Sequence, residues 1–206
     1  MKKLKFSIFL AFLMFMAPVA ANAQHFGVNT NVLGWAYASP NLGVDVGLSK
    51  HFALTADALW SPFEFSGKSH KFWAVQPELR FYPRYRFAGH FIGAEGHFGN
   101  YNFGMGQYRY LGSCMAGCGI TYGYNWILGN RWNLEASVSL GYTCLNDKEV
   151  IAYNPVGEKS YFSDEYRQHV FSGWQYQGFG YTFGNGLCRQ YLGISRVGLT
   201  FTYFIF

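Results

Sequence analysis

The chain has 206 residues with a formal net charge of +5, and half of the residues are hydrophobic, 21% are aromatic and only 13% are charged. This composition excludes an intrinsically disordered chain, which needs low hydrophobicity and high charge. The 25 glycines and the many aromatic side chains argue against a helical protein, because both weaken helices, and they favour β-strands that face an apolar environment.

The first 23 residues have the three parts of a secretory signal peptide. Three lysines within the first five residues precede an apolar run over 6–17, and an A-x-A cleavage site ends at Ala23. The run is shorter than the roughly 20 residues that span a membrane, so we expect cleavage after Ala23 and export. Without the leader, 13 basic residues face 11 acidic ones, and no basic run remains that would indicate nucleic-acid binding.

The mature chain, 24–206, is predicted to form one all-β domain. Apolar and polar residues alternate with a period of two, which is typical of strands with one polar and one apolar face. The eight predicted strands are 26–32, 42–48, 52–60, 73–81, 89–99, 120–126, 132–142 and 191–205.

The connections between these strands alternate in length. Tight turns at 49–51, 83–86 and 129–131 alternate with longer connections, of which the longest, near 145–189, is a predicted outer loop; the others are 38–40, which is short, 61–70 and 100–112. Short periplasmic turns and longer outer loops are typical of outer-membrane barrels. We therefore predict a transmembrane antiparallel up-and-down β-barrel of eight strands in the bacterial outer membrane; a hairpin within the long loop would make ten.

The alternation also fits a soluble barrel whose apolar face points inward. Aromatic residues near strand ends favour the membrane barrel instead, because aromatic belts lie at the two membrane interfaces. These residues are Trp35, Trp60, Tyr82, Trp126, Trp132 and Tyr142.

In a membrane barrel the polar face points inward, where eight strands leave room only for side chains. The predicted interior charged network consists of Asp45, Asp57, Glu78, Arg80, Glu95, His97, Glu135 and Arg196. Charges in such an interior must be paired and hydrogen-bonded, which predicts a polar plug that stiffens the barrel. The alternative is a proton or ion site centred on Glu95 and His97, but two ligands are a weak metal signal. No metal, cofactor or catalytic residue is predicted.

The chain has four cysteines, and export places them where disulfides persist. Cys114 and Cys118 lie about 13 Å apart along one strand, which is too far for a bridge. The tight turn before the seventh strand places Cys144 opposite residue 116 and one diagonal step from Cys114. A Cys144–Cys188 disulfide would close the base of the long loop, and we favour it slightly over a bridge to Cys114; the alternative to any bridge is four free thiols.

The long loop is rich in aromatic residues and glycines, which suggests a binding surface. The residues proposed to contact a partner are Tyr161, Phe162, Trp174, Tyr176, Phe179 and Tyr181. The alternative is that the loop only extends the neighbouring strands.

Several stretches of the chain resemble a known family. The most specific are Gln76-Pro77-Glu78-Leu79-Arg80 and Arg131-Trp132-Asn133-Leu134-Glu135. They resemble the DUF3575 family of Bacteroidales outer-membrane β-barrel proteins, whose function is unknown. The resemblance covers residues 25–145 and implies an outer-membrane barrel of the cell envelope, but no activity.

We expect a structural or interaction barrel in contact with outer-membrane lipid and lipopolysaccharide. It would present its loop to a surface or fimbrial protein, or support envelope or fimbria-like assembly, and would not bind nucleic acid. The alternative is a lipid-modifying enzyme that acts on lipid A or phospholipid. Such an enzyme needs an acid–base set near the outer rim, and the histidines there, His70 and His169, have no recognised spacing to a nucleophile.

Overall fold

The computed structural model describes residues 26–65, 68–105, 108–146, 149–153, 159–161, 175–177, 180–185 and 188–205. The predicted signal peptide lies outside these residues. The elements of the described part are β1 (Phe26–Asn31), α2 (Val32–Ala36), β2 (Asn41–Gly47), β3 (Phe52–Ser61), β4 (Glu64–Phe65), β5 (Lys68–Phe81), β6 (Gly89–Met105), β7 (Tyr108–Ile127), β8 (Trp132–Asn146), β9 (Glu149–Tyr153), β10 (Lys159–Tyr161), β11 (Gln175–Gln177), β12 (Gly180–Asn185) and β13 (Cys188–Phe204).

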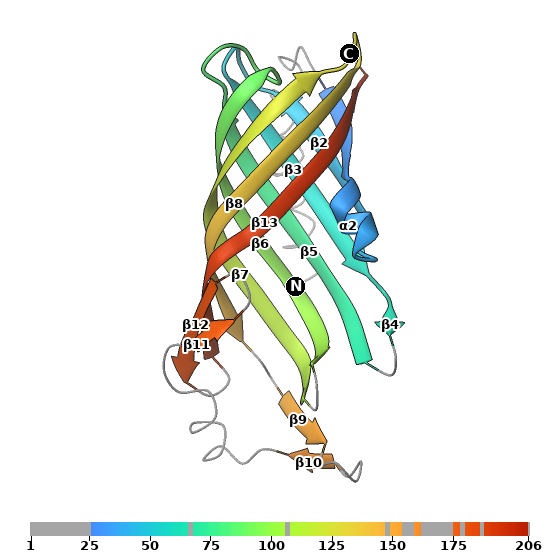
Figure 1. Ribbon diagram of the computed structural model, residues 1–206, viewed down its shortest axis with the longest axis vertical. Coiled ribbons are helices and arrows are strands. Elements are labelled where there is room, and N and C mark those ends of the chain that lie inside the picture. The colour runs from blue at the N-terminus through green and yellow to red at the C-terminus, as the bar shows by residue number, and fades with distance from the viewer. Residues whose placement is uncertain are drawn as a thin grey trace, which may run out of the picture.

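Eight of these strands pair in a closed ring and form a barrel (Figure 1). In order around the ring they are β1, β2, β3, β5, β6, β7, β8 and β13, and each is antiparallel to the next. The ring closes where β13 pairs with β1, with Phe204 opposite Gly27 and Thr200 opposite Asn31. The predicted eight-stranded up-and-down barrel is therefore confirmed. Within the described residues, no helix is long and apolar enough to cross a bilayer.

Several strands extend further toward the long-loop end than the sequence predicts. Strand β7 begins at Tyr108 instead of residue 120, and β6 continues to Met105, so the predicted loop 100–112 is wrong. Over residues 112–119 the alternation is weak, because four of the eight residues are glycine or alanine and two are cysteine. The backbone ladder of β7 with β6 and β8 holds this segment extended despite its weak pattern.

The short strands β9 to β12 lie at the long-loop end of the barrel (Figure 1). Strand β9 pairs with β7 and β10, and β12 pairs with β13 and β11. They prolong the wall as hairpins and do not enter the ring, so the ten-strand alternative is wrong.

The two faces of the wall have the opposite polarity to a soluble barrel. In β8 the inward residues Glu135 and Ser139 are buried, with 1% and 0% exposure, whereas the outward Leu140 is 62% exposed. The same alternation runs through β2, β3 and the central parts of β5, β6 and β7. The apolar side chains thus cover the outside of the barrel, and the polar ones fill it.

An aromatic cluster fills the barrel at the short-turn end. Tyr82 and Phe91 are fully buried, and Phe87 and Phe204 are nearly so. Tyr82 lies 5.3 Å from Phe91 between ring centroids, and Phe87 lies 4.8 Å from Phe204. Our prediction that Tyr82 belongs to an outer aromatic belt is therefore wrong, because the turn after β5 carries it into the barrel mouth. Phe87 has a φ of 59°, which bulky residues rarely adopt, and Asn133 Nδ2 donates to its carbonyl oxygen at 2.8 Å.

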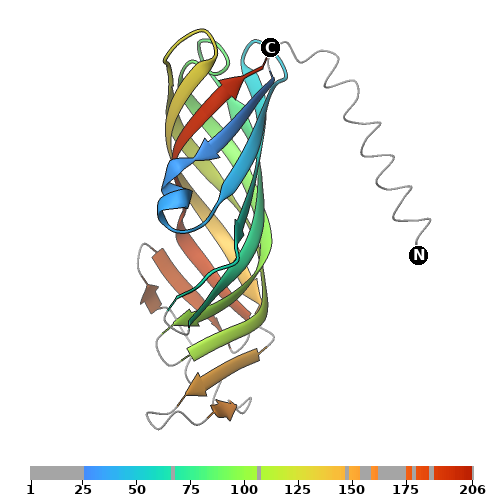
Figure 2. The same cartoon turned by 90° about the vertical axis from the view of Figure 1, so that its right-hand side faces the viewer.

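Strands β1 and β2 are much shorter than their neighbours, and helix α2 joins them partway along the wall (Figure 2). Asn31 precedes the helix as its N-cap, and its side-chain oxygen accepts from the backbone N–H of Leu33 at 3.1 Å. Between α2 and the long-loop end of the barrel, β1 and β2 no longer form part of the wall, and the longer strands form it alone.

Candidate functional site

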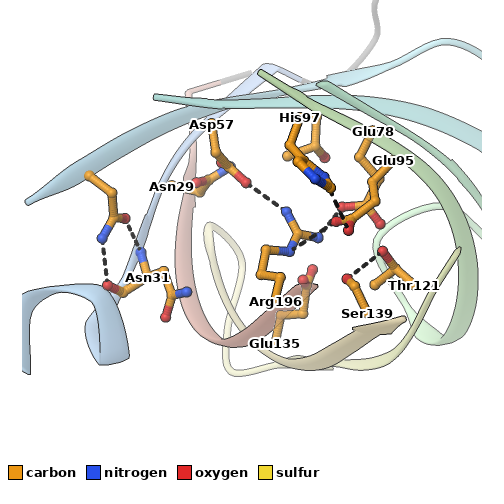
Figure 3. A network of polar contacts seen from close by, with 12 residues as sticks. Asn29, Asn31, Asp57, Glu78, Glu95, His97, Thr121, Glu135, Ser139 and Arg196 are labelled. Carbon is orange, nitrogen blue, oxygen red and sulfur yellow. Dashed lines mark hydrogen bonds and ion pairs between the residues drawn. The ribbon is translucent and has the colours of Figure 1, made fainter. Parts of the chain in front are cut away.

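The barrel interior holds a network of charged side chains that come from strands distant in sequence (Figure 3). All eight residues of the predicted network lie on the inward face of the wall. Six of them are classed with the buried polar residues, while Asp57 and Arg196 retain 19% and 9% side-chain exposure. The eight residues come from six strands of the ring, β2, β3, β5, β6, β8 and β13.

Arg80 forms the first centre of the network. Its Nη1 donates to Glu135 Oε2 at 2.7 Å and its Nη2 to Glu78 Oε2 at 3.0 Å. The guanidinium carbon also lies 4.7 Å from the centroid of the Phe91 ring. Arg80 thus links β5 to β8 across the barrel. Through its contact with Phe91 it also joins the polar network to the aromatic cluster.

Arg196 forms the second centre. Its Nη1 donates to Asp57 Oδ2 at 3.1 Å, its Nη2 donates to Glu78 Oε2, and its Nε lies 3.6 Å from Glu95 Oε2. Glu78 Oε2 therefore bridges the two arginines. Joined by this carboxylate, the two arginines and their partners connect five strands, β3, β5, β6, β8 and β13, so the loss of either arginine would affect the whole network.

A β-bulge in β13 places two consecutive side chains, those of Ser195 and Arg196, inside the barrel. The register between β13 and β8 shifts between Ile194 and Arg196, which leaves Ser195 without an opposite residue. Ser195 Oγ donates to Glu95 Oε1, a short hydrogen bond of 2.5 Å. Sequence analysis missed Ser195, because a bulge breaks the alternation on which the inward assignments depend.

Asp45 forms a separate centre with neutral partners. Its carboxylate accepts from Asn29 Nδ2 at 3.0 Å, from Thr55 Oγ1 at 2.6 Å and from Thr202 Oγ1 at 3.1 Å. These three neutral residues are not members of the predicted charged network. The alternation could have predicted that their side chains face inward, since each lies two residues from another inward residue on its strand.

Carboxylates outnumber the arginines that they contact. Four carboxylates, from Asp57, Glu78, Glu95 and Glu135, surround Arg80 and Arg196. One oxygen of each carboxylate is buried and has no hydrogen-bond partner: Asp57 Oδ1, Glu78 Oε1, Glu95 Oε2 and Glu135 Oε1. Arg80 Nε and Arg196 Nε are likewise buried without a hydrogen-bond partner, so unpaired donors and acceptors both occur in the network, which holds four carboxylates to two arginines.

Glu95 and His97, the centre of the alternative proton or ion site, lie close together in the barrel. His97 Nε2 is hydrogen-bonded to Thr143 Oγ1 at 2.7 Å, and its Nδ1 lies 4.0 Å from Glu95 Oε1. Within the described residues, no three histidine, cysteine, aspartate or glutamate side chains are grouped so that they could hold a metal ion. The contacts of His97 join it to Thr143 and place it beside Glu95.

Inward-facing glycines make room for the large interior side chains. A Cβ at Gly119 would lie 2.9 Å from Glu95 Oε1 and 2.7 Å from the Leu140 carbonyl oxygen. A Cβ at Gly123 would meet the Phe91 ring, and one at Gly93 would meet the Glu78 carboxylate. These contacts explain part of the high glycine content, which composition alone attributed to strands in general.

We expect Gly119→Ala to lower the free energy of unfolding by about 1–3 kcal/mol, because the added methyl group overpacks the interior. Gly96→Ala is the matched control, since the nearest atom to a Cβ there is 3.8 Å away. Urea unfolding of both variants in detergent, followed by tryptophan fluorescence, measures the difference. Equal stability of the two variants would show that the interior is looser than the structure indicates.

The favoured Cys144–Cys188 disulfide is wrong. Cys144 is a free, exposed cysteine, as are Cys114 and Cys118. In the ladder Cys144 lies opposite Gln190, and Cys188 lies opposite Asn146, so the two cysteines are diagonal neighbours. Diagonal residues have Cα atoms about 7–8 Å apart, beyond the usual disulfide range. The predicted register of Cys144 opposite residue 116 is confirmed.

The predicted partner-binding residues fall only partly in the described chain. Tyr161 ends β10, Tyr176 lies in β11 and Tyr181 lies in β12, whereas Phe162, Trp174 and Phe179 lie outside the described residues. Of the two histidines considered for an enzyme, His70 lies in β5 opposite Phe103, and His169 lies outside the described residues.

A closed ring of eight antiparallel strands with a charged interior and an apolar outer wall defines a small β-barrel of inverted polarity. Over residues 8–171 the chain matches the family described as a protein of unknown function, DUF3575. The chain belongs to this family. The match reaches beyond residue 145, so part of the long loop lies within the family's range, contrary to our sequence analysis. No curated protein and no solved structure matches the chain.

Proposed function

We propose that this protein is an outer-membrane barrel of structural or interaction type, without enzymatic activity. One observation carries the proposal: the outward side chains of the wall are apolar and exposed, whereas the inward ones are polar and buried. Water would be a poor solvent for such a wall, and contiguous apolar surface of this extent indicates contact with lipid or protein. An outward apolar band with a polar interior is the pattern of a membrane barrel.

The spacing of aromatic residues fits the thickness of a bilayer. Trp132 and Tyr142 lie ten positions apart on the outward face of β8. At about 3.3 Å per residue and a tilt of about 40° this spacing corresponds to roughly 25 Å along the barrel axis, the height of the apolar band in membrane barrels.

The filled interior favours an anchoring role over transport. The charged network occupies the middle of the barrel, and the cluster around Phe91 fills the short-turn end. The functional surface would then be the long-loop end, where the hairpins extend the wall and the sequence concentrates aromatic residues. A surface or fimbrial protein is the partner we propose there, with lipid and lipopolysaccharide around the wall.

Membrane insertion can be tested with one arginine on the wall. Val138 faces outward near the middle of the aromatic spacing, and Val138→Arg is expected to destabilise the barrel in lipid vesicles by about 2–4 kcal/mol. Leu128→Arg is the control, because Leu128 is exposed in the short turn, where the cost falls to about 0–1 kcal/mol. Recovery of both variants as folded protein in the soluble periplasmic fraction would overturn the proposal.

The interaction role can be tested by shortening the long loop. Asn146 and Cys188 are paired at the ends of β8 and β13, so a short Gly-Ser turn can replace residues 147–187. We expect the shortened barrel to fold and to lose the partner that the full chain cross-links in outer-membrane fractions. Unchanged co-purification would place the partner site elsewhere. Altered lipid A or phospholipid profiles in His70→Ala or His169→Ala cells would instead favour the enzyme.

A further inference from the structure

A cavity of about 610 Å³ lies where helix α2 meets the barrel wall. Its apolar lining includes Leu33 of α2, Leu59 of β3, Phe72 of β5 and Ile194 of β13, and its polar lining includes Asp57 and Arg196. The volume lies within the range of pockets that enclose small molecules, about 300–1,000 Å³. The cavity therefore joins an apolar chamber to one edge of the charged network.

The wall beside this cavity is incomplete. Strand β1 ends opposite Thr200, and β12 begins to pair with β13 only at Gly193. Along the six residues between, no other strand of the described chain pairs with this edge of β13. The edge is covered instead by α2 and by Asn31, whose side chain donates to Val197 O at 3.3 Å and accepts from Leu199 N at 3.1 Å.

The cavity reaches the outer surface through this gap. Val197 and Tyr37 both line it and are 53% and 84% exposed. A molecule could thus reach the interior from the side of the wall, with an apolar part near α2 and a polar part near Asp57.

The charged residues at the edge of the cavity determine which polar group of a bound molecule would fit there. Each nitrogen group of Arg196 already faces a carboxylate, of Asp57, Glu78 or Glu95. Asp57 Oδ1 is buried without a hydrogen-bond partner, and the surrounding network holds more carboxylates than arginines. A carboxylate or phosphate would meet like charge there, whereas an ammonium group would supply both positive charge and hydrogen-bond donors.

We propose that this cavity binds an amphiphile with an ammonium head group, with its head beside Asp57 and its apolar part between α2 and β13. The cavity and the charged network alone form this site, so the amphiphile would bind whether or not the long loop binds a partner.

Photo-cross-linking of the purified full chain in a nonionic detergent tests this proposal. The probes are a medium-chain alkylamine that carries a diazirine and the carboxylic acid with the same chain. We expect the amine to label peptides that contain residues 31–41 and 194–200, and unlabelled amine to compete with it. The acid should label these peptides at least about tenfold less, since a charge-assisted contact discriminates at this level.

Two aspartate variants decide the role of the charge. Asp57→Asn removes the charge with little change of shape and should lower amine labelling at these peptides about tenfold. Asp45→Asn is the matched control, because Asp45 is buried in the same barrel but has three neutral donors and does not line the cavity. Equal labelling by amine and acid, labelling spread over the wall, or no effect of Asp57→Asn in a folded barrel would overturn the proposal.

Discussion

Replacing Arg80 by methionine is expected to destabilise the barrel by about 3–5 kcal/mol, because it leaves the buried Glu135 carboxylate without its cation and Glu78 with Arg196 alone. Glu78 and Glu135 both pair with Arg80, and their side chains are 0% and 1% exposed. Urea unfolding in detergent or in vesicles measures the loss. Arg131→Met is the control, since Arg131 is exposed and donates only to Tyr203 Oη among the contacts described.

A second change separates the charge from the packing of Arg80. In Arg80→Met combined with Glu135→Gln, one uncompensated charge is removed, so we expect part of the stability to return. If the single and the double variant are equally unstable, the arginine acts through its packing against Phe91, and the ion pairs contribute little.

Phe91→Ala is expected to lower the free energy of unfolding by about 3–5 kcal/mol, because it leaves a cavity in the aromatic cluster. Phe91 is fully buried, contacts Tyr82 and lies beneath the Arg80 guanidinium. Thermal unfolding followed by circular dichroism measures the effect. The matched control is Phe98→Ala on the same strand, since Phe98 is 48% exposed on the outer wall. A larger loss for Phe98→Ala would show that the wall, and not the interior cluster, sustains the barrel.

The barrel and most of its interior could be predicted because alternation of polar and apolar residues fixes which side chains face inward. Asp45, Glu78 and Glu135 follow that rule, and each lies in a regular part of its strand. The rule fails where the backbone is irregular. Ser195 was missed because the bulge adds an inward residue, and Tyr82 was placed outside because it lies past the end of the β5 ladder, which the pattern does not describe.

Pairing partners were harder to predict than faces. The tight turn before β8 fixes the register with β7, so the position opposite Cys144 could be predicted. The register of β13 depends on β8 and β1, which are distant in sequence, and no local turn sets it. The proposed disulfide failed for that reason, since a shift of two residues separates opposite cysteines from diagonal ones.

The closure of the ring by its first and last strands has a consequence for folding. Strands β1 and β13 pair although they lie at opposite ends of the part of the chain that the structure describes. Until β13 arrives, β1 and β8 each expose an unpaired backbone edge, which is a template for aggregation. Since long-range pairing is slow, we expect the closure between β1 and β13 to be the slowest pairing of the barrel. A chain truncated before β13 should depend on chaperones and be degraded rather than form a smaller barrel.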